Sequence, residues 1–80
     1  MSTPPNRQVM ELFAKAQAYH RSGQFGLAES HYLRVTKLDA RNADAWHLLG
    51  VAVYQMGKVD KAISHYRRAV ELRPRGDNAK

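Results

Sequence analysis

Histidine is the residue type in this sequence best suited to bind a transition metal or to transfer a proton near neutral pH. The chain has four histidines and no cysteine, so thiolate ligands and disulfides are excluded. No two histidines have the i, i+4 spacing of a helical zinc site. His31 follows Glu29 and Ser30, but consecutive residues of a helix point in different directions and do not form a catalytic triad. We therefore expect no metal, no cofactor and no enzyme active site.

Basic side chains are the second group that could carry function. The 13 Lys and Arg residues outnumber the 7 Asp and Glu residues, and the net charge of +6 favours acidic partners. Toward the C-terminal end the cations are Lys58, Lys61, Arg67, Arg68, Arg73, Arg75 and Lys80. Two interpretations stay open: a solvated helix whose cations complement the negative end of its dipole, or a docking patch for an acidic partner. RNA recognition requires aromatic platforms between basic groups, and only Tyr66 is close, so nucleic acid is disfavoured.

Helices must position these side chains. Apolar residues recur every three to four positions in four successive runs, which indicates four amphipathic helices. Polar or glycine-containing breaks at residues 22–24, 39–42 and 57 separate the runs, and Pro74 ends the last one. We expect Asn6 and Asn42 to be N-caps, and Gly23 to take the left-handed conformation after a helix end. No sustained alternation with a period of two is present, so no strand is expected.

The sequence repeats itself after 34 residues. A shift by this distance superposes nine identical pairs: Ala18 and Ala52, Gly23 and Gly57, Ala28 and Ala62, Ser30 and Ser64, His31 and His65, Tyr32 and Tyr66, Arg34 and Arg68, Leu38 and Leu72, and Arg41 and Arg75. A helix–turn–helix unit of this length cannot cover its apolar face alone, so neighbouring units are expected to stack.

This period resembles the tetratricopeptide repeat, whose pattern is W-x2-L-G-x2-Y, then A-x3-F, then P. The second unit, residues 43–76, carries the pattern at Trp46, Leu49, Gly50, Ala62, Tyr66 and Pro74. The first unit, residues 9–42, is looser and carries it at Leu12, Ala16, Tyr19, Ala28 and Tyr32. Lys15 replaces the leucine, Ala40 the proline and Val53 the second unit's tyrosine. The resemblance implies an all-α fold of two antiparallel helix–turn–helix hairpins, stacked as a short right-handed solenoid.

The resemblance also implies a division of the chain. Residues 1–6 form an extended polar lead and residues 7–76 the repeat domain, while residues 77–80 are a tail or the start of a truncated third repeat. The outer side of the fourth helix would then be uncovered, although it carries the apolar residues Ile63, Tyr66 and Val70. Two explanations fit: the chain is a fragment of a longer array, such as a bacterial one, which we favour, or this side mediates self-association.

In this family the first helix of each repeat lines a concave groove that binds a protein or peptide. By position, the groove of this chain comprises Met10, Phe13, Gln17, His20, Arg21, Asp44, His47, Leu48, Val51, Tyr54 and Gln55. The lysine and asparagine clamp of the chaperone-binding subclass is absent, because Phe13, Gln17 and Leu48 occupy its positions. The expected function is a non-enzymatic protein–protein interaction scaffold, and the positive charge suggests an acidic partner.

Two alternatives stay open. The chain is alternatively the N-terminal targeting domain of a longer enzyme, such as a glycosyl-, methyl- or sulfotransferase-like protein, or an excised or designed scaffold without a ligand. The start of the sequence has no basic segment followed by an apolar run, so no signal peptide is predicted. No apolar stretch approaches the ~18 residues needed to span a membrane. The sequence thus predicts a cytoplasmic protein.

Overall fold

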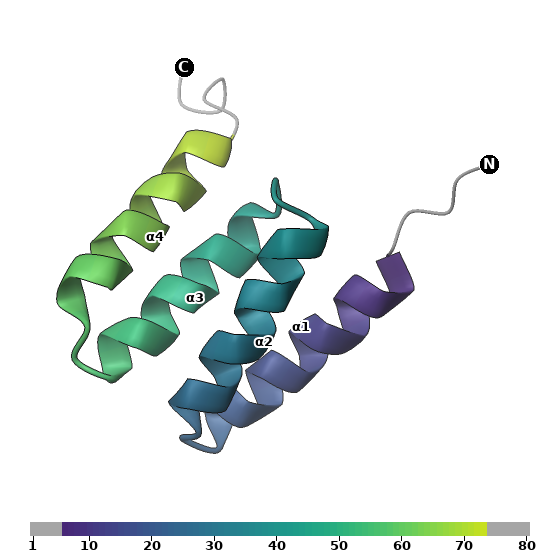
Figure 1. The fold of residues 1–80 in the computed structure, drawn as a ribbon, viewed down its shortest axis with the longest axis horizontal. Coiled ribbons are helices and arrows are strands. Elements are labelled where there is room, and N and C mark those ends of the chain that lie inside the picture. Colours follow the sequence, from purple (N-terminus) through teal and green to yellow (C-terminus); the bar gives the residue numbers. More distant parts are fainter. Residues whose placement is uncertain (1–5, 74–80) are drawn as a thin grey trace.

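The computed structural model describes residues 6–73 of the chain. They form four helices, α1 (Asn6–Arg21), α2 (Phe25–Leu38), α3 (Ala43–Gln55) and α4 (Val59–Leu72). The helices follow one another across the molecule in chain order (Figure 1). No strand occurs within residues 6–73. The predicted all-α fold of two stacked helical hairpins is confirmed.

The two hairpin turns have the same hydrogen-bonded geometry. Gly23 and Gly57 have φ angles of 82° and 84°, which glycine adopts without steric strain. After α1, the Gln24 N–H donates to the Tyr19 carbonyl at 2.8 Å, and the Gly23 N–H donates to the His20 carbonyl at 3.0 Å. This pair of bonds is the Schellman motif. The prediction of a left-handed residue at Gly23 is therefore confirmed.

The helix starts agree only in part with the expected caps. The Asn42 side chain accepts a hydrogen bond from the Ala45 N–H at 3.0 Å, as an N-cap does. Asn6 is the first residue of α1 and does not precede it, so the expected cap at Asn6 is wrong by one residue. Several predicted features lie outside the described residues: the polar lead at residues 1–5, the helix end at Pro74, the cations Arg75 and Lys80, and the tail at residues 77–80.

One buried cluster joins all four helices. Its fully buried members are Ala16, Ala28, Tyr32, Leu49, Ala52, Val53 and Ala62. Small residues from α1, α2 and α4 let the helices approach closely, whereas Tyr32, Leu49 and Val53 supply most of the buried apolar volume. A smaller cluster of Val9, Val35 and Ala45 extends the core toward the start of α1. The two repeats therefore share a single core.

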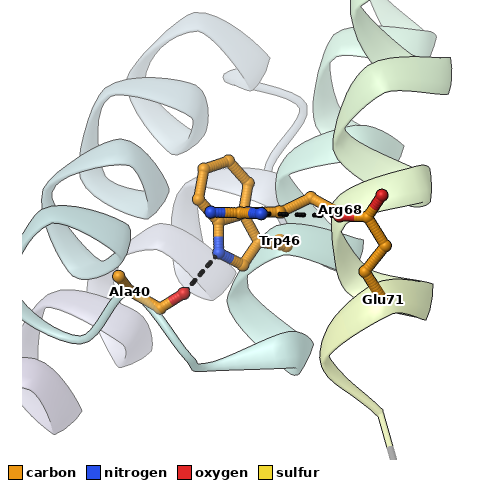
Figure 2. A network of polar contacts seen from close by, with 4 residues as sticks. All are labelled: Ala40, Trp46, Arg68 and Glu71. Atoms are coloured by element: carbon orange, nitrogen blue, oxygen red, sulfur yellow. Dashed lines mark hydrogen bonds and ion pairs between the residues drawn. The ribbon is translucent and has the colours of Figure 1, made fainter.

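Trp46 connects this core to two neighbouring segments. Its half-buried ring packs against the cluster, and its indole N–H donates to the Ala40 carbonyl at 2.9 Å. The Arg68 guanidinium lies 5.9 Å from the centre of the indole ring and pairs with Glu71 at 3.4 Å (Figure 2). Trp46 thus links the α2–α3 connection to α3 and α4. In this connection Ala40 replaces the proline of the repeat pattern.

Gly50 lies where α3 and α4 are in close contact. A Cβ atom at this position would lie 2.7 Å from two ring carbons of Tyr66 and 3.3 Å from the Ala62 carbonyl oxygen. Separations below 3.0 Å are too short for carbon atoms that are not bonded to each other. The absence of a side chain at Gly50 is what lets the Tyr66 ring lie against α3.

Candidate functional site

Five of the predicted groove residues line one hollow, together with a tyrosine from α2. The hollow has a volume of about 330 Å³ and is lined by Gln17, His20, Arg21, Tyr32, Leu48 and Val51. We call it the groove hollow. The α1 residues are three and four positions apart, and the two α3 residues are three apart, so each set lies on one face of its helix. The packing of both helices against α2 brings these faces together.

Tyr32 forms the floor of the groove hollow and was not among the predicted groove residues. Its side chain is fully buried, and its hydroxyl lies 3.3 Å from His20 Nδ1, within hydrogen-bond distance. The Phe13 ring packs edge-on against it, with ring centres 5.8 Å apart. Burial raises the pKa of the Tyr32 hydroxyl, and the nearby Arg21 charge opposes this shift. The floor of the hollow is therefore a neutral phenol at physiological pH.

The groove hollow combines an apolar surface with a polar edge. Leu48 and Val51 are half-buried and present aliphatic carbons beside the Tyr32 floor. Gln17, His20 and Arg21 on α1 add an amide, an imidazole and an exposed guanidinium. Binding sites commonly join apolar walls to a few convergent polar groups in this way. The arrangement suits an apolar side chain whose neighbouring carbonyl or carboxylate accepts hydrogen bonds from Arg21.

The other predicted groove residues on α3 lie outside this hollow. The Asp44 side chain is 79% exposed, with its carboxylate 4.0 Å from the Arg73 guanidinium. The His47 ring lies 5.5 Å from the Tyr66 ring. Tyr54 and Gln55 are exposed near the end of α3. None of these four residues contributes to the lining of the groove hollow.

The last two residues of the predicted groove, Phe13 and Met10, are on α1. Phe13 is half-buried and packs against both core clusters, so its position is explained by the fold. Met10 is exposed and lines a different, shallow hollow with Arg7, Glu11 and Ala14. The predicted groove residues therefore divide into a convergent group at the groove hollow and a dispersed remainder.

The predicted oligomer face on α4 is exposed at two of its three residues. Ile63 and Val70 are 49% and 58% exposed. With Tyr66 and Arg67 they line a shallow hollow of about 370 Å³. Tyr66 is half-buried because one side of its ring packs against Gly50. The outer side of α4 thus presents a largely apolar surface.

The histidines outside the groove hollow have packing contacts. The His31 ring lies 5.1 Å from the Tyr19 ring, and its Nδ1 lies 3.0 Å from the Leu27 carbonyl oxygen. His65 packs on Trp46, with ring centres 5.7 Å apart. Burial lowers the pKa of His65, the Lys61 charge lowers it further, and Glu29 opposes both. Within residues 6–73 no three His, Asp or Glu side chains converge as metal ligands would.

A basic hollow between α2 and α4 was not predicted from the sequence. It has a volume of about 480 Å³ and is lined by Gly26, Glu29, Ser30, Leu33, Arg34, Lys37, Lys58 and Lys61. Lys58 and Lys61 belong to the predicted cluster of cations, but Arg34 and Lys37 do not. The two segments that line this hollow each belong to the second helix of a repeat, and the second helices of adjacent repeats border a common surface. This shared repeat position is the signal from which the hollow could have been predicted.

Much of the predicted cation cluster is engaged within the described residues. Arg68 pairs with Glu71, and Arg73 pairs with Asp44. Lys58 and Lys61 both approach Glu29. Among residues 6–73, no helix is long and apolar enough to cross a membrane.

Comparison with known proteins gives a consistent family assignment. The sequence model of a family described as tetratricopeptide repeat matches residues 13–77. The human E3 SUMO-protein ligase RanBP2 is 32% identical over 74 residues, which cover 91% of this chain and 2% of that protein. The human Superkiller complex protein 3 is 30% identical over 69 residues, 86% of this chain and 4% of that protein. Tetratricopeptide repeat protein 37 of Xenopus laevis is 29% identical, with 86% of this chain and 4% of that protein covered. This chain therefore spans a very small part of the length of these relatives.

Proposed function

Because the chain belongs to the tetratricopeptide repeat family, we propose that it binds an extended segment of a partner protein in the groove hollow. Repeats of this family are in general protein–protein interaction modules and are typically not catalytic. The observation that carries the proposal is the convergence of Gln17, His20 and Arg21 with Leu48 and Val51 around one hollow.

The chemistry of the hollow defines the segment we propose. An aliphatic or aromatic side chain would contact Leu48, Val51 and the Tyr32 ring, which removes apolar surface from water. A carboxylate or backbone carbonyl beside that side chain would accept hydrogen bonds from Arg21, and charge-assisted bonds of this kind are stronger than neutral ones. A segment that carries an apolar residue next to an acidic one satisfies both requirements.

Selection of random peptides displayed on phage against the whole chain tests this proposal. The selected peptides are titrated by calorimetry into the wild type and into Gln17→Ala/Arg21→Ala, which leaves the buried core intact. We expect the substitutions to weaken binding by at least about tenfold, or about 1.4 kcal/mol. The control is Ser22→Ala/Arg41→Ala, which changes one polar and one cationic residue outside the hollow.

The outcome separates the groove hollow from the rest of the surface. Weaker binding by the groove variant alone, with circular dichroism unchanged, supports the proposal. Equal affinity for both variants, or no enrichment of peptides on the wild type, contradicts it.

A second proposal, from a different class, places this chain in a longer enzyme as its targeting domain. It is supported by the small fraction of each relative that the chain covers, and by the name of one of them, a SUMO-protein ligase. In that setting the groove hollow would bind the protein toward which the enzyme is directed.

A third proposal is self-association through α4. Thr36 on α2 is 5% exposed, whereas Val70, at the same repeat position on α4, is 58% exposed. Glu29 on α2 corresponds to Ile63 on α4, so the outer side of α4 is more apolar than its counterpart. Exposed apolar patches of this kind often mark interaction surfaces.

A second copy fits this surface best by pairing α4 with α4. Continuation of the stack onto α1 of the next copy would place Glu11 and Lys15 against apolar side chains, because their repeat counterparts on α3, Ala45 and Leu49, are the residues that stacking buries. Burial of these charges without partners is costly. A two-fold arrangement instead places apolar Ile63 and Val70 of both copies in one interface.

Sedimentation equilibrium over a range of concentrations tests the self-association. We expect a dimer for the wild type and a monomer for Ile63→Lys/Val70→Lys, because two lysines on each copy would be buried. Leu27→Lys/Leu38→Lys is the matched control, since these leucines are also exposed and lie on α2. A wild-type monomer at every concentration excludes the second copy and leaves another protein as the occupant of this side of α4.

A further inference from the structure

The basic hollow lies on a different surface from the groove hollow. Its lining comes from α2 and from the start of α4, whereas the groove hollow is lined mainly from α1 and α3. The two share no lining residue. A partner in the basic hollow would therefore not compete directly with a segment in the groove hollow.

A carboxylate of the protein itself, that of Glu29, already lies among the cations of this hollow. The two carboxylate oxygens of Glu29 lie 3.8 Å from Lys58 Nζ and 3.6 Å from Lys61 Nζ. The Glu29 side chain is only 15% exposed, while both lysines are about half exposed or more. Two cations, Lys58 just before α4 and Lys61 in its first turn, thus converge on one acidic group of α2.

The hollow keeps an excess of positive charge after this pairing. Its lining has four cations and one carboxylate, which leaves a net charge of three. Arg34 and Lys37 are three positions apart on α2, both are exposed, and neither forms an ion pair within residues 6–73.

The lining favours an acidic protein segment over a nucleic acid. Half-buried Leu33 offers an apolar contact between the charged groups. The lining contains no aromatic side chain on which a base could stack. Glu29 inside the hollow would also repel a continuous line of phosphates, whereas spaced carboxylates can bind to Arg34 and Lys37, which both lie more than one helical turn beyond it on α2.

We propose that the basic hollow docks an acidic segment of a partner protein, with Arg34 and Lys37 binding its carboxylates and Leu33 contacting an apolar side chain between them. This docking adds a second binding surface to the module and does not depend on the groove hollow. One chain would then hold two protein segments at once, on surfaces formed by different helix pairs.

Fluorescence anisotropy with a labelled peptide of alternating glutamate and leucine tests this proposal. The reference probes are the same peptide with glutamine in place of glutamate, and an oligouridine RNA. We expect the acidic peptide to bind more tightly than both. Its binding should weaken as the salt concentration rises, because exposed charges are screened.

Two charge-reversal variants separate the site from the general charge of the protein. Arg34→Glu/Lys37→Glu is expected to weaken binding of the acidic peptide by at least about tenfold. The control, Lys15→Glu/Arg41→Glu, lowers the net charge by the same amount at exposed positions outside the hollow, and should change the affinity little. Both charge-reversal variants are made in the Gln17→Ala/Arg21→Ala background, because a peptide with leucine next to glutamate also meets the requirements proposed for the groove hollow. Binding that persists in this background is binding outside the groove hollow.

Each alternative result overturns the proposal. Equal losses of affinity in both charge-reversal variants would mean that the peptide is attracted only to the overall charge of the protein. Tighter binding of the RNA, lost in Arg34→Glu/Lys37→Glu, would identify a nucleic-acid surface. If circular dichroism shows that the glutamate variant is not folded, Arg34→Gln/Lys37→Gln replaces it, and unchanged affinity in that variant rejects the site.

Discussion

Replacement of Tyr32 by alanine is expected to destabilise the protein by about 3–5 kcal/mol, the range for deletion of a large buried aromatic side chain. Tyr32 is the largest fully buried side chain and packs on Phe13 in the cluster that joins all four helices. A domain of this length has a total stability of only about 4–12 kcal/mol. Urea unfolding followed by circular dichroism should therefore show a variant that is largely unfolded, or close to it, without denaturant.

Tyr32→Phe is the matched control for this prediction. It keeps the ring and removes only the hydroxyl, whose neighbour is His20 Nδ1 at 3.3 Å. We expect a loss of about 0.5–1.5 kcal/mol, the usual net contribution of one hydrogen bond. A Tyr32→Ala variant as stable as Tyr32→Phe would contradict the central position of this ring in the core.

Replacement of Gly50 by alanine is expected to destabilise the protein by about 1–3 kcal/mol, as overpacking of a core does. This is opposite to the general preference of helices for alanine over glycine, which is worth about 1 kcal/mol. The reason is the 2.7 Å separation between the new Cβ atom and the Tyr66 ring carbons. Either the ring or the backbone of α4 must move to accommodate the methyl group.

Gly26→Ala provides a control with the opposite expected sign. Gly26 lies in α2, and a Cβ atom there would have no neighbour within 4 Å. This variant should be more stable than the wild type by about 0.4–1 kcal/mol. In a double-mutant cycle, Tyr66→Ala should reduce the cost of Gly50→Ala, because the clashing ring is gone. A cost of Gly50→Ala that is the same with and without the Tyr66 ring would disprove the steric explanation.

The helices and their turns follow from local signals, which is why they could be predicted from the sequence. Asn42 and Gly23 each act on neighbouring backbone groups, so their chemistry is sufficient to place a cap and a turn. The stacking of the hairpins was predictable because Ala28 and Ala62 recur at equivalent repeat positions. Both residues are buried in the structure. Asn6 shows the limit of these signals, since the start of α1 was misplaced by one residue.

The binding surfaces depend on how the helices lie relative to one another, which a repeat pattern alone does not specify. The repeat pattern assigned Phe13 and Gln17 to the same groove. In the structure, Phe13 packs against the core, whereas Gln17 lines the groove hollow. The basic hollow was missed for the same reason. Its cations come from segments more than twenty residues apart, and only the packing of the helices brings Arg34 and Lys58 to one surface.

The order of the helices has a consequence for how the chain acquires its structure. Within residues 6–73, extensive packing joins only α1 with α2, α2 with α3, and α3 with α4. Such connectivity gives a low contact order, because each stabilising pair is formed by segments close together in the sequence, and chains of this type fold rapidly. Either hairpin can nucleate first, and the other then adds to it across the α2–α3 boundary, so assembly can proceed from both directions along the array.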